Sequence, residues 1–146
     1  MAKLLEARFR TRTWYLLAFA ATIATGVASR RFSDVLPAFV GKYPGDALWA
    51  LMVFFGMGAI FKKTSSLHLS LGALGFCFGI EALKVCQAPW LASIRQTTWG
   101  HLVFGHVFSW QNLVAYTVGV LAGLAAEVFV VPKLDGQPRK LSGRPG

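Results

Sequence analysis

The sequence predicts an all-α integral membrane protein, a four-span helical bundle with both termini in the cytoplasm. Of the 146 residues, 55% are hydrophobic and 14% are charged, whereas about a quarter of the residues of a soluble domain are charged. The apolar residues form four long blocks, each near the length that crosses a hydrocarbon core of roughly 30 Å. Most of the cations stand at the ends of these blocks. Together these observations favour a membrane protein over a soluble domain.

The first expected span covers about residues 13–29 and has arginines on both sides. Its small-residue end at residues 27–29, together with its basic start, is also the pattern of a cleaved secretory signal. The apolar run is long for a signal, and the segments that follow it are themselves membrane-like. A retained span is therefore the preferred interpretation, and cleavage stays open.

The second expected span covers residues 46–61 and is closed by Lys62 and Lys63. It is short for a span, but residues 43–46 extend it through the membrane interface. The third and fourth expected spans cover residues 66–85 and 111–131, at full spanning length.

A tryptophan-rich segment separates the last two spans. It contains Trp90, Trp99 and Trp110, and tryptophan is the usual anchor at headgroup depth. We therefore expect an interfacial or re-entrant segment before the last span. Residues 1–131 then form a single transmembrane domain, and residues 132–146, rich in Pro, Gly and charge, form a basic disordered tail.

The orientation follows from the distribution of Lys and Arg. With four spans, ten of the 15 Lys and Arg residues lie on one side: Lys3, Arg8, Arg10, Arg12, Lys62, Lys63, Lys133, Arg139, Lys140 and Arg144. The side richer in cations is the cytoplasmic side. Both termini are therefore predicted to be inside.

This orientation gathers polar side chains at the outer ends of the spans. The candidate binding cluster comprises Asp46, Glu81, Lys84, Gln87, Arg95 and Asn112. Arginine binds phosphate or carboxylate in bidentate fashion, and a carboxylate at the interface can act as an acid or base. Alternatively, the groups pair with one another and fix the helix register, as Glu81 and Lys84 can do at i and i+3. The pairing alternative carries more weight, because spatial convergence is inferred.

Other kinds of site find little support. Glu127 lies at the opposite end, where we expect it to snorkel or to pair with a cytoplasmic cation. His68 lies on the cytoplasmic side, while His101 and His106, five apart outside, lack the i, i+4 spacing of metal ligands on one helix face. No metal, cofactor or catalytic motif is predicted. The net charge of +9 does not indicate nucleic-acid binding, because the cations form no basic face apart from the span ends.

Small residues four apart permit close helix contact in lipid. They occur as Gly75 and Gly79 in the third span and as Gly119 and Gly123 in the fourth. These pairs predict contact between the two spans, although glycine is also simply common in such helices. A homo-oligomer formed through a glycine face stays open.

Several segments carry a resemblance to a known family: GKYPGDALWALMVFF, IEALKVCQAPWLASIRQTTWGHLVFG and FSWQNLVAYTVGVLAG. They resemble domain-of-unknown-function family 2809 of small bacterial inner-membrane proteins. The resemblance implies a multi-pass inner-membrane protein without an assigned activity. The family pattern has glutamine in place of Lys84 and aspartate in place of Asn112. The ordered acid, glutamine, arginine and polar residue before a glycine-bearing last span is more loosely similar to VanZ-like proteins, linked to glycopeptide resistance.

The best candidate role is binding of an envelope lipid or lipid-linked headgroup, anionic or polyprenyl, at the outer leaflet. Two alternatives remain open. One is a membrane-embedded enzyme that acts on such a headgroup, although the absence of a catalytic motif does not favour it. The other is a small transporter or structural subunit in which the charged cluster serves assembly alone.

Overall fold

The computed structural model describes residues 10–31, 38–86, 88–100 and 107–130. The regular elements of these residues are all helices, which confirms the all-α class. They are α2 (Arg12–Arg31), α3 (Ala38–Ile60), α4 (Ser66–Leu83), α5 (Pro89–Arg95) and α7 (Trp110–Phe129). The expected tail, residues 132–146, lies outside the described residues.

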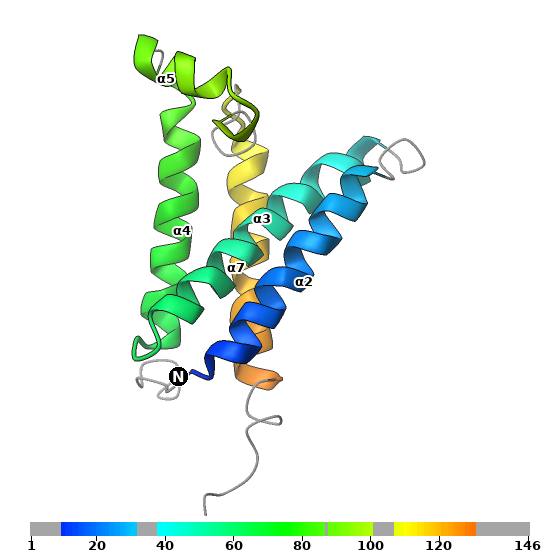
Figure 1. Ribbon diagram of the computed structural model, residues 1–146, viewed down its shortest axis with the longest axis vertical. Helices are drawn as coiled ribbons and strands as arrows, with labels where there is room; N and C mark the ends of the chain where they lie inside the picture. Colours follow the sequence, from blue (N-terminus) through cyan, green and yellow to red (C-terminus); the bar gives the residue numbers. More distant parts are fainter. Residues whose placement is uncertain (1–9, 32–37, 87, 101–106, 131–146) are drawn as a thin grey trace, which may run out of the picture.

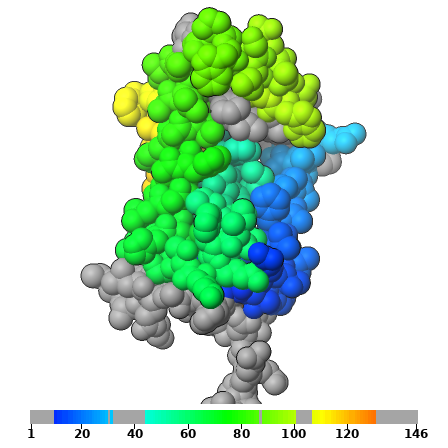
Figure 2. Space-filling view, turned by 60° about the vertical axis from the view of Figure 1, so that its left-hand side comes forward, coloured from blue at the N-terminus to red at the C-terminus, as the bar shows by residue number. Residues whose placement is uncertain are grey.

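The four long helices run alternately up and down (Figure 1). The starts of α2 and α4 and the ends of α3 and α7 lie at the lower end of the view, while α5 lies across the upper end. Helix α3 is central, since it contacts α2, α4 and α7, and α4 also contacts α7. Figure 2 shows α4 along the full height of one face with α5 above it.

Two of the described helices, α4 and α7, are long and apolar enough to cross a membrane. Helix α3 contains a shorter apolar stretch, Pro44–Ile60. Large apolar side chains on the outer faces of α4 and α7 are exposed, among them Phe76 and Leu121. Such exposed apolar surface indicates a membrane or partner environment, because soluble monomers rarely leave large apolar patches uncovered.

The helix bounds differ from the expected spans chiefly in α3. This helix begins at Ala38 and continues through Pro44, although proline removes one intrahelical hydrogen bond and commonly breaks a helix. Helix α4 begins at Ser66, where the sequence places it, because the Ser65 hydroxyl accepts a hydrogen bond from the backbone N–H of His68. This is the ordinary way in which serine caps a helix start.

Glycines bring α2 close to α3. A Cβ on Gly58 would lie 2.3 Å from the ring of Tyr15, and a Cβ on Gly56 would lie 3.2 Å from the ring of Phe19. Both aromatic residues belong to α2. The aromatic rings of α2 therefore pack directly against the glycines of α3.

Glycines also bring α7 close to α3. A Cβ on Gly119 would lie 2.1 Å from the carbonyl oxygen of Ala47, and a Cβ on Gly123 would lie 2.6 Å from the ring of Phe54. The backbone of α7 approaches α3 this closely because no side chain intervenes.

The expected contact between the two glycine pairs is corrected by the structure. Gly75 and Gly79 of α4 are exposed, and a Cβ at either position would meet no atom within 4 Å. Gly119 and Gly123 face α3 instead. The physical reason is that α3 occupies the centre of the bundle. The glycines of α7 therefore allow a close approach to α3 and not to α4.

Candidate functional site

A buried carboxylate joins the upper ends of α4 and α7. Glu81 is 0% exposed. Its Oε1 accepts hydrogen bonds from the backbone N–H of Ser109 at 2.9 Å and from Asn112 Nδ2 at 3.2 Å. Its Oε2 accepts from Lys84 Nζ at 2.6 Å and from the Tyr116 hydroxyl at 2.9 Å. We call these five residues the Glu81 cluster.

Local structure explains why the Glu81 cluster forms. Glu81 lies in the last turn of α4, and Lys84 is the C-cap residue of that helix. On α7, Asn112 and Tyr116 are four residues apart and so share one face. The carboxylate also lies at the N-terminal end of α7, where the helix dipole favours negative charge. The chain thus supplies every donor to a carboxylate that would be costly to bury alone.

Arg95 donates hydrogen bonds to backbone carbonyls at the end of α4 and not to the Glu81 carboxylate. It is buried at the end of α5. Its Nη1 donates to the carbonyl of Cys86 at 3.1 Å, and its Nη2 donates to the carbonyl of Leu83 at 2.5 Å. The last carbonyls of a helix have no partner within that helix. Arg95 therefore caps α4 and holds α5 across the bundle end.

Two buried polar atoms near this end have no hydrogen-bond partner. They are Arg95 Nε, a donor, and Asn112 Oδ1, an acceptor. Both side chains are buried. A buried unsatisfied polar atom is destabilising and is normally paired with protein, water or a ligand. Each of the two atoms therefore keeps hydrogen-bonding capacity that is not used.

The two remaining expected site residues are Asp46 and Gln87. Asp46 lies on α3, half-buried, and is near enough to Tyr116 for the two groups to interact electrostatically. Gln87 lies outside the described residues. The structure thus brings Glu81, Lys84 and Asn112 into direct contact and turns Arg95 toward the end of α4.

Sequence reasoning missed two members of the Glu81 cluster. Tyr116 follows Asn112 by four residues, and this spacing was a usable signal. The donor from Ser109 is its backbone N–H. A backbone group carries no signal in the residue type, so only the folded chain identifies it.

A second buried ion pair lies at the lower end of the bundle. Arg10 Nη2 is 2.8 Å from Glu127 Oε1, which also accepts a hydrogen bond from the Ser66 hydroxyl at 2.8 Å. Arg10 Nε donates to the Tyr15 hydroxyl at 3.2 Å, and its Nη1 donates to the backbone carbonyl of Thr64. The expectation that Glu127 pairs with a cation is confirmed, and its partner precedes the first long helix.

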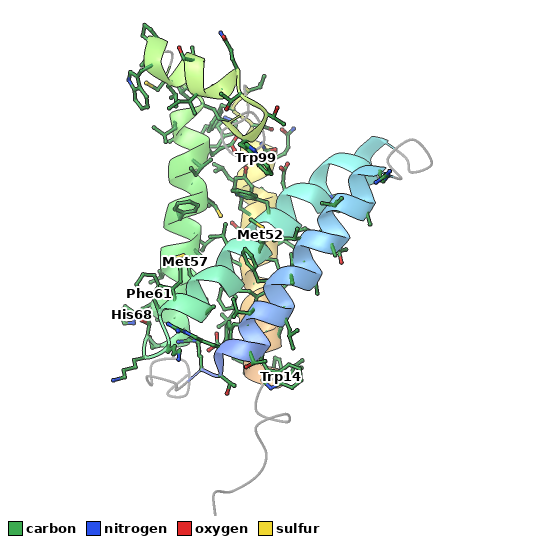
Figure 3. All side chains as sticks on the ribbon, viewed as in Figure 1. Trp14, Met52, Met57, Phe61, His68 and Trp99 are labelled. Atoms are coloured by element: carbon green, nitrogen blue, oxygen red, sulfur yellow. The ribbon has the colours of Figure 1, made fainter. Side chains whose placement is uncertain are left out.

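Exposed tryptophans mark both ends of the bundle. Trp14 lies at the lower end and Trp99 at the upper end (Figure 3), and Trp99 is 78% exposed. Tryptophans at two levels are typical of the two interfaces of a membrane. Among the residues that the structure describes, no group of three or more His, Cys, Asp or Glu is placed to hold a metal ion.

Comparison with known proteins gives one family. No solved structure matches the chain. The family described as "Protein of unknown function (DUF2809)" matches residues 35–120, a range that contains Asp46, Arg95 and the whole Glu81 cluster. The looser similarity to VanZ-like proteins is not shown by this comparison and stays a prediction. Because the match covers more than half of the sequence, this chain belongs to the DUF2809 family, whose members have no assigned function.

Proposed function

We propose that the chain is a multi-pass protein of the bacterial inner membrane in which all four long helices cross the bilayer. The apolar length of α4 and α7 supports this proposal, as does the antiparallel packing of α2 and α3 beside them (Figure 1). Arg10, Arg12, Lys62 and Lys63 all lie at the lower end. The positive-inside rule assigns that end to the cytoplasm.

Reporter fusions test this topology. We expect a reporter that is active only in the cytoplasm to work after Lys63, and one that is active only outside the membrane to work after Arg95. Each site carries both reporters in turn, so that every fusion gives one positive signal. The reverse pattern would mean that the bundle has the opposite orientation in the membrane. The same signal at both sites would mean that α4 does not cross the membrane.

We further propose that the upper end of the bundle binds the polar headgroup of an envelope lipid, either an anionic or a polyprenyl-linked lipid. The observation that carries this proposal is the unpaired Nε of Arg95 and Oδ1 of Asn112. One is a donor and the other an acceptor, so a headgroup that has both phosphate and hydroxyl or amide groups suits them. Arg95 adds the charge that favours phosphate.

The Glu81 carboxylate has a different task in this proposal. It already accepts four hydrogen bonds from the chain, so it joins the helix ends rather than binding a ligand. Because the hydrogen-bonding capacity of Glu81 is filled by the chain, a second candidate function is also supported. In that case the protein is structural, and its polar cluster only holds the helices together. The two candidates differ in whether a lipid occupies the site.

Native mass spectrometry of the purified protein separates the candidates. We expect a recurrent anionic or polyprenyl lipid on the wild type and roughly tenfold less on Arg95→Lys, because hydrogen bonds to charged groups contribute about 1.5–3 kcal/mol. Lysine keeps the charge but loses Nε and the planar fork. Ser93→Ala, at an exposed position of the same helix, is the matched control.

Two outcomes would contradict headgroup binding at this end. One is a wild type without any recurrent lipid, which leaves the structural candidate. The other is equal lipid on a folded Arg95→Lys protein. Conversion of the bound lipid during incubation would instead point to a membrane-embedded enzyme.

A further inference from the structure

A groove lies between α2 and α3, away from the Glu81 cluster. Its volume is about 280 Å³, and its walls include Ile23, Gly26 and Val27 of α2 and Gly45, Trp49 and Met52 of α3. Met52 is labelled on α3 in Figure 3. We call this hollow the α2–α3 groove. It is partly open to the surroundings.

The α2–α3 groove exists because two glycines leave space unfilled. A Cβ built on Gly26 or on Gly45 would meet no atom within 4 Å. Lower along the same pair of helices, Gly58 is covered by the ring of Tyr15. Gly58 therefore allows close packing of α2 against α3, whereas Gly26 and Gly45 leave a hollow between the same two helices.

The chemistry of the walls defines the occupant. The residues that line the groove are apolar, and Val27 on its rim is 58% exposed. The volume falls just below the roughly 300–1,000 Å³ of pockets that enclose an entire small ligand. The groove is therefore suited to part of a hydrocarbon chain that remains continuous with the surrounding lipid.

A cation stands beyond the end of the groove. Arg31 follows Val27 by four residues, so the two share one face of α2 about 6 Å apart along the axis. Its side chain is exposed, and within the described part of the chain it makes no ion pair. Guanidinium groups bind phosphate by paired hydrogen bonds.

We propose that the α2–α3 groove binds one acyl chain of an anionic phospholipid, whose phosphate is bound by Arg31. The apolar walls accept the chain, and the arginine one turn beyond Val27 selects the charge. This inference rests on the proposed function only in requiring that α2 and α3 cross the membrane. It does not depend on the headgroup site at Arg95.

The test is lipid titration of the purified full chain in detergent, followed by native mass spectrometry. The probes are phosphatidylglycerol and phosphatidylcholine with identical acyl chains. We expect the wild type to retain phosphatidylglycerol roughly tenfold better. Gly26→Leu, which fills the groove, should lose roughly tenfold of this retention, and Gly45→Leu fills it from the other wall. Arg31→Gln should remove the preference between the two lipids.

Gly75→Leu is the matched control, because its Cβ also meets open space but lies on the outer face of α4. It should bind lipid as the wild type does. Wild-type retention by folded Gly26→Leu and Gly45→Leu would overturn the proposal. So would a change of oligomeric state without loss of lipid, since a second copy of the chain would then occupy the groove.

The groove and the headgroup site can fail separately, because native mass spectrometry counts the lipids bound to each chain and each site should hold one of them. Loss of lipid from Gly26→Leu with none from Arg95→Lys would overturn the headgroup site alone. The opposite pattern would overturn the groove alone.

Discussion

Replacing Gly119 by leucine is expected to disrupt the bundle, whereas the same replacement at Gly75 should leave it folded. The Cβ at position 119 would lie 2.1 Å from the backbone oxygen of Ala47. A backbone atom cannot turn aside as a side chain can, so α3 and α7 must separate. Overpacking of a closed contact costs about 1–3 kcal/mol or more. Thermal unfolding followed by circular dichroism in detergent measures the difference.

The comparison is well matched because both glycines begin a pair with four-residue spacing in a candidate span. At Gly75 a new side chain meets open space, and leucine is also the better helix former. If Gly75→Leu proved as damaging as Gly119→Leu, the outer face of α4 would have to be a contact surface, for example between two copies of the chain. If Gly119→Leu were harmless, the close approach of α7 to α3 would be wrong.

The second large effect is expected from Glu81→Leu. This change leaves the Lys84 ammonium without its carboxylate and leaves the Asn112 and Tyr116 donors without an acceptor. Removing one partner of a buried ion pair typically costs about 3–5 kcal/mol. We therefore expect a large fall in the thermal unfolding temperature in detergent. Gln96→Leu, at an exposed position near the same end, should have little effect.

A double variant separates the ion pair from the rest of the cluster. Glu81→Leu combined with Lys84→Met removes both charges, and it should be less destabilised than the sum of the two single variants. Exact additivity would contradict the pairing of Glu81 with Lys84. The stability that Glu81 adds would then come from its hydrogen bonds with Asn112 and Tyr116 of α7.

The sequence predicted the helices better than their bounds. The start of α4 was predictable, because Lys62 and Lys63 end one apolar block and the next begins directly after Ser65. The start of α3 was not, because the Pro44–Gly45 pair indicates a helix boundary by local chemistry alone. The helix nevertheless begins at Ala38, as tertiary packing commonly overrides local preference.

The sequence predicted at which end of the bundle the candidate site lies, but not which side chains contact each other there. Topology alone places the end of α4 beside the start of α7, so Glu81 and Asn112 were expected at one height. Nothing in the residue types indicated that Arg95 would turn to the carbonyls of Leu83 and Cys86 instead of joining Glu81. The carbonyl oxygens at a helix end lack partners within that helix, and they compete with a carboxylate for the same guanidinium.

The sequence by itself determined the all-α class, the apolar blocks that become helices and the gathering of polar residues at their ends. Only the tertiary structure decided how each helix is turned about its own axis. A helix that is apolar on every side has no amphipathic face to reveal its orientation. Packing of one surface into another makes that choice, and so it placed Gly119 on Ala47, left Gly75 open and created the α2–α3 groove.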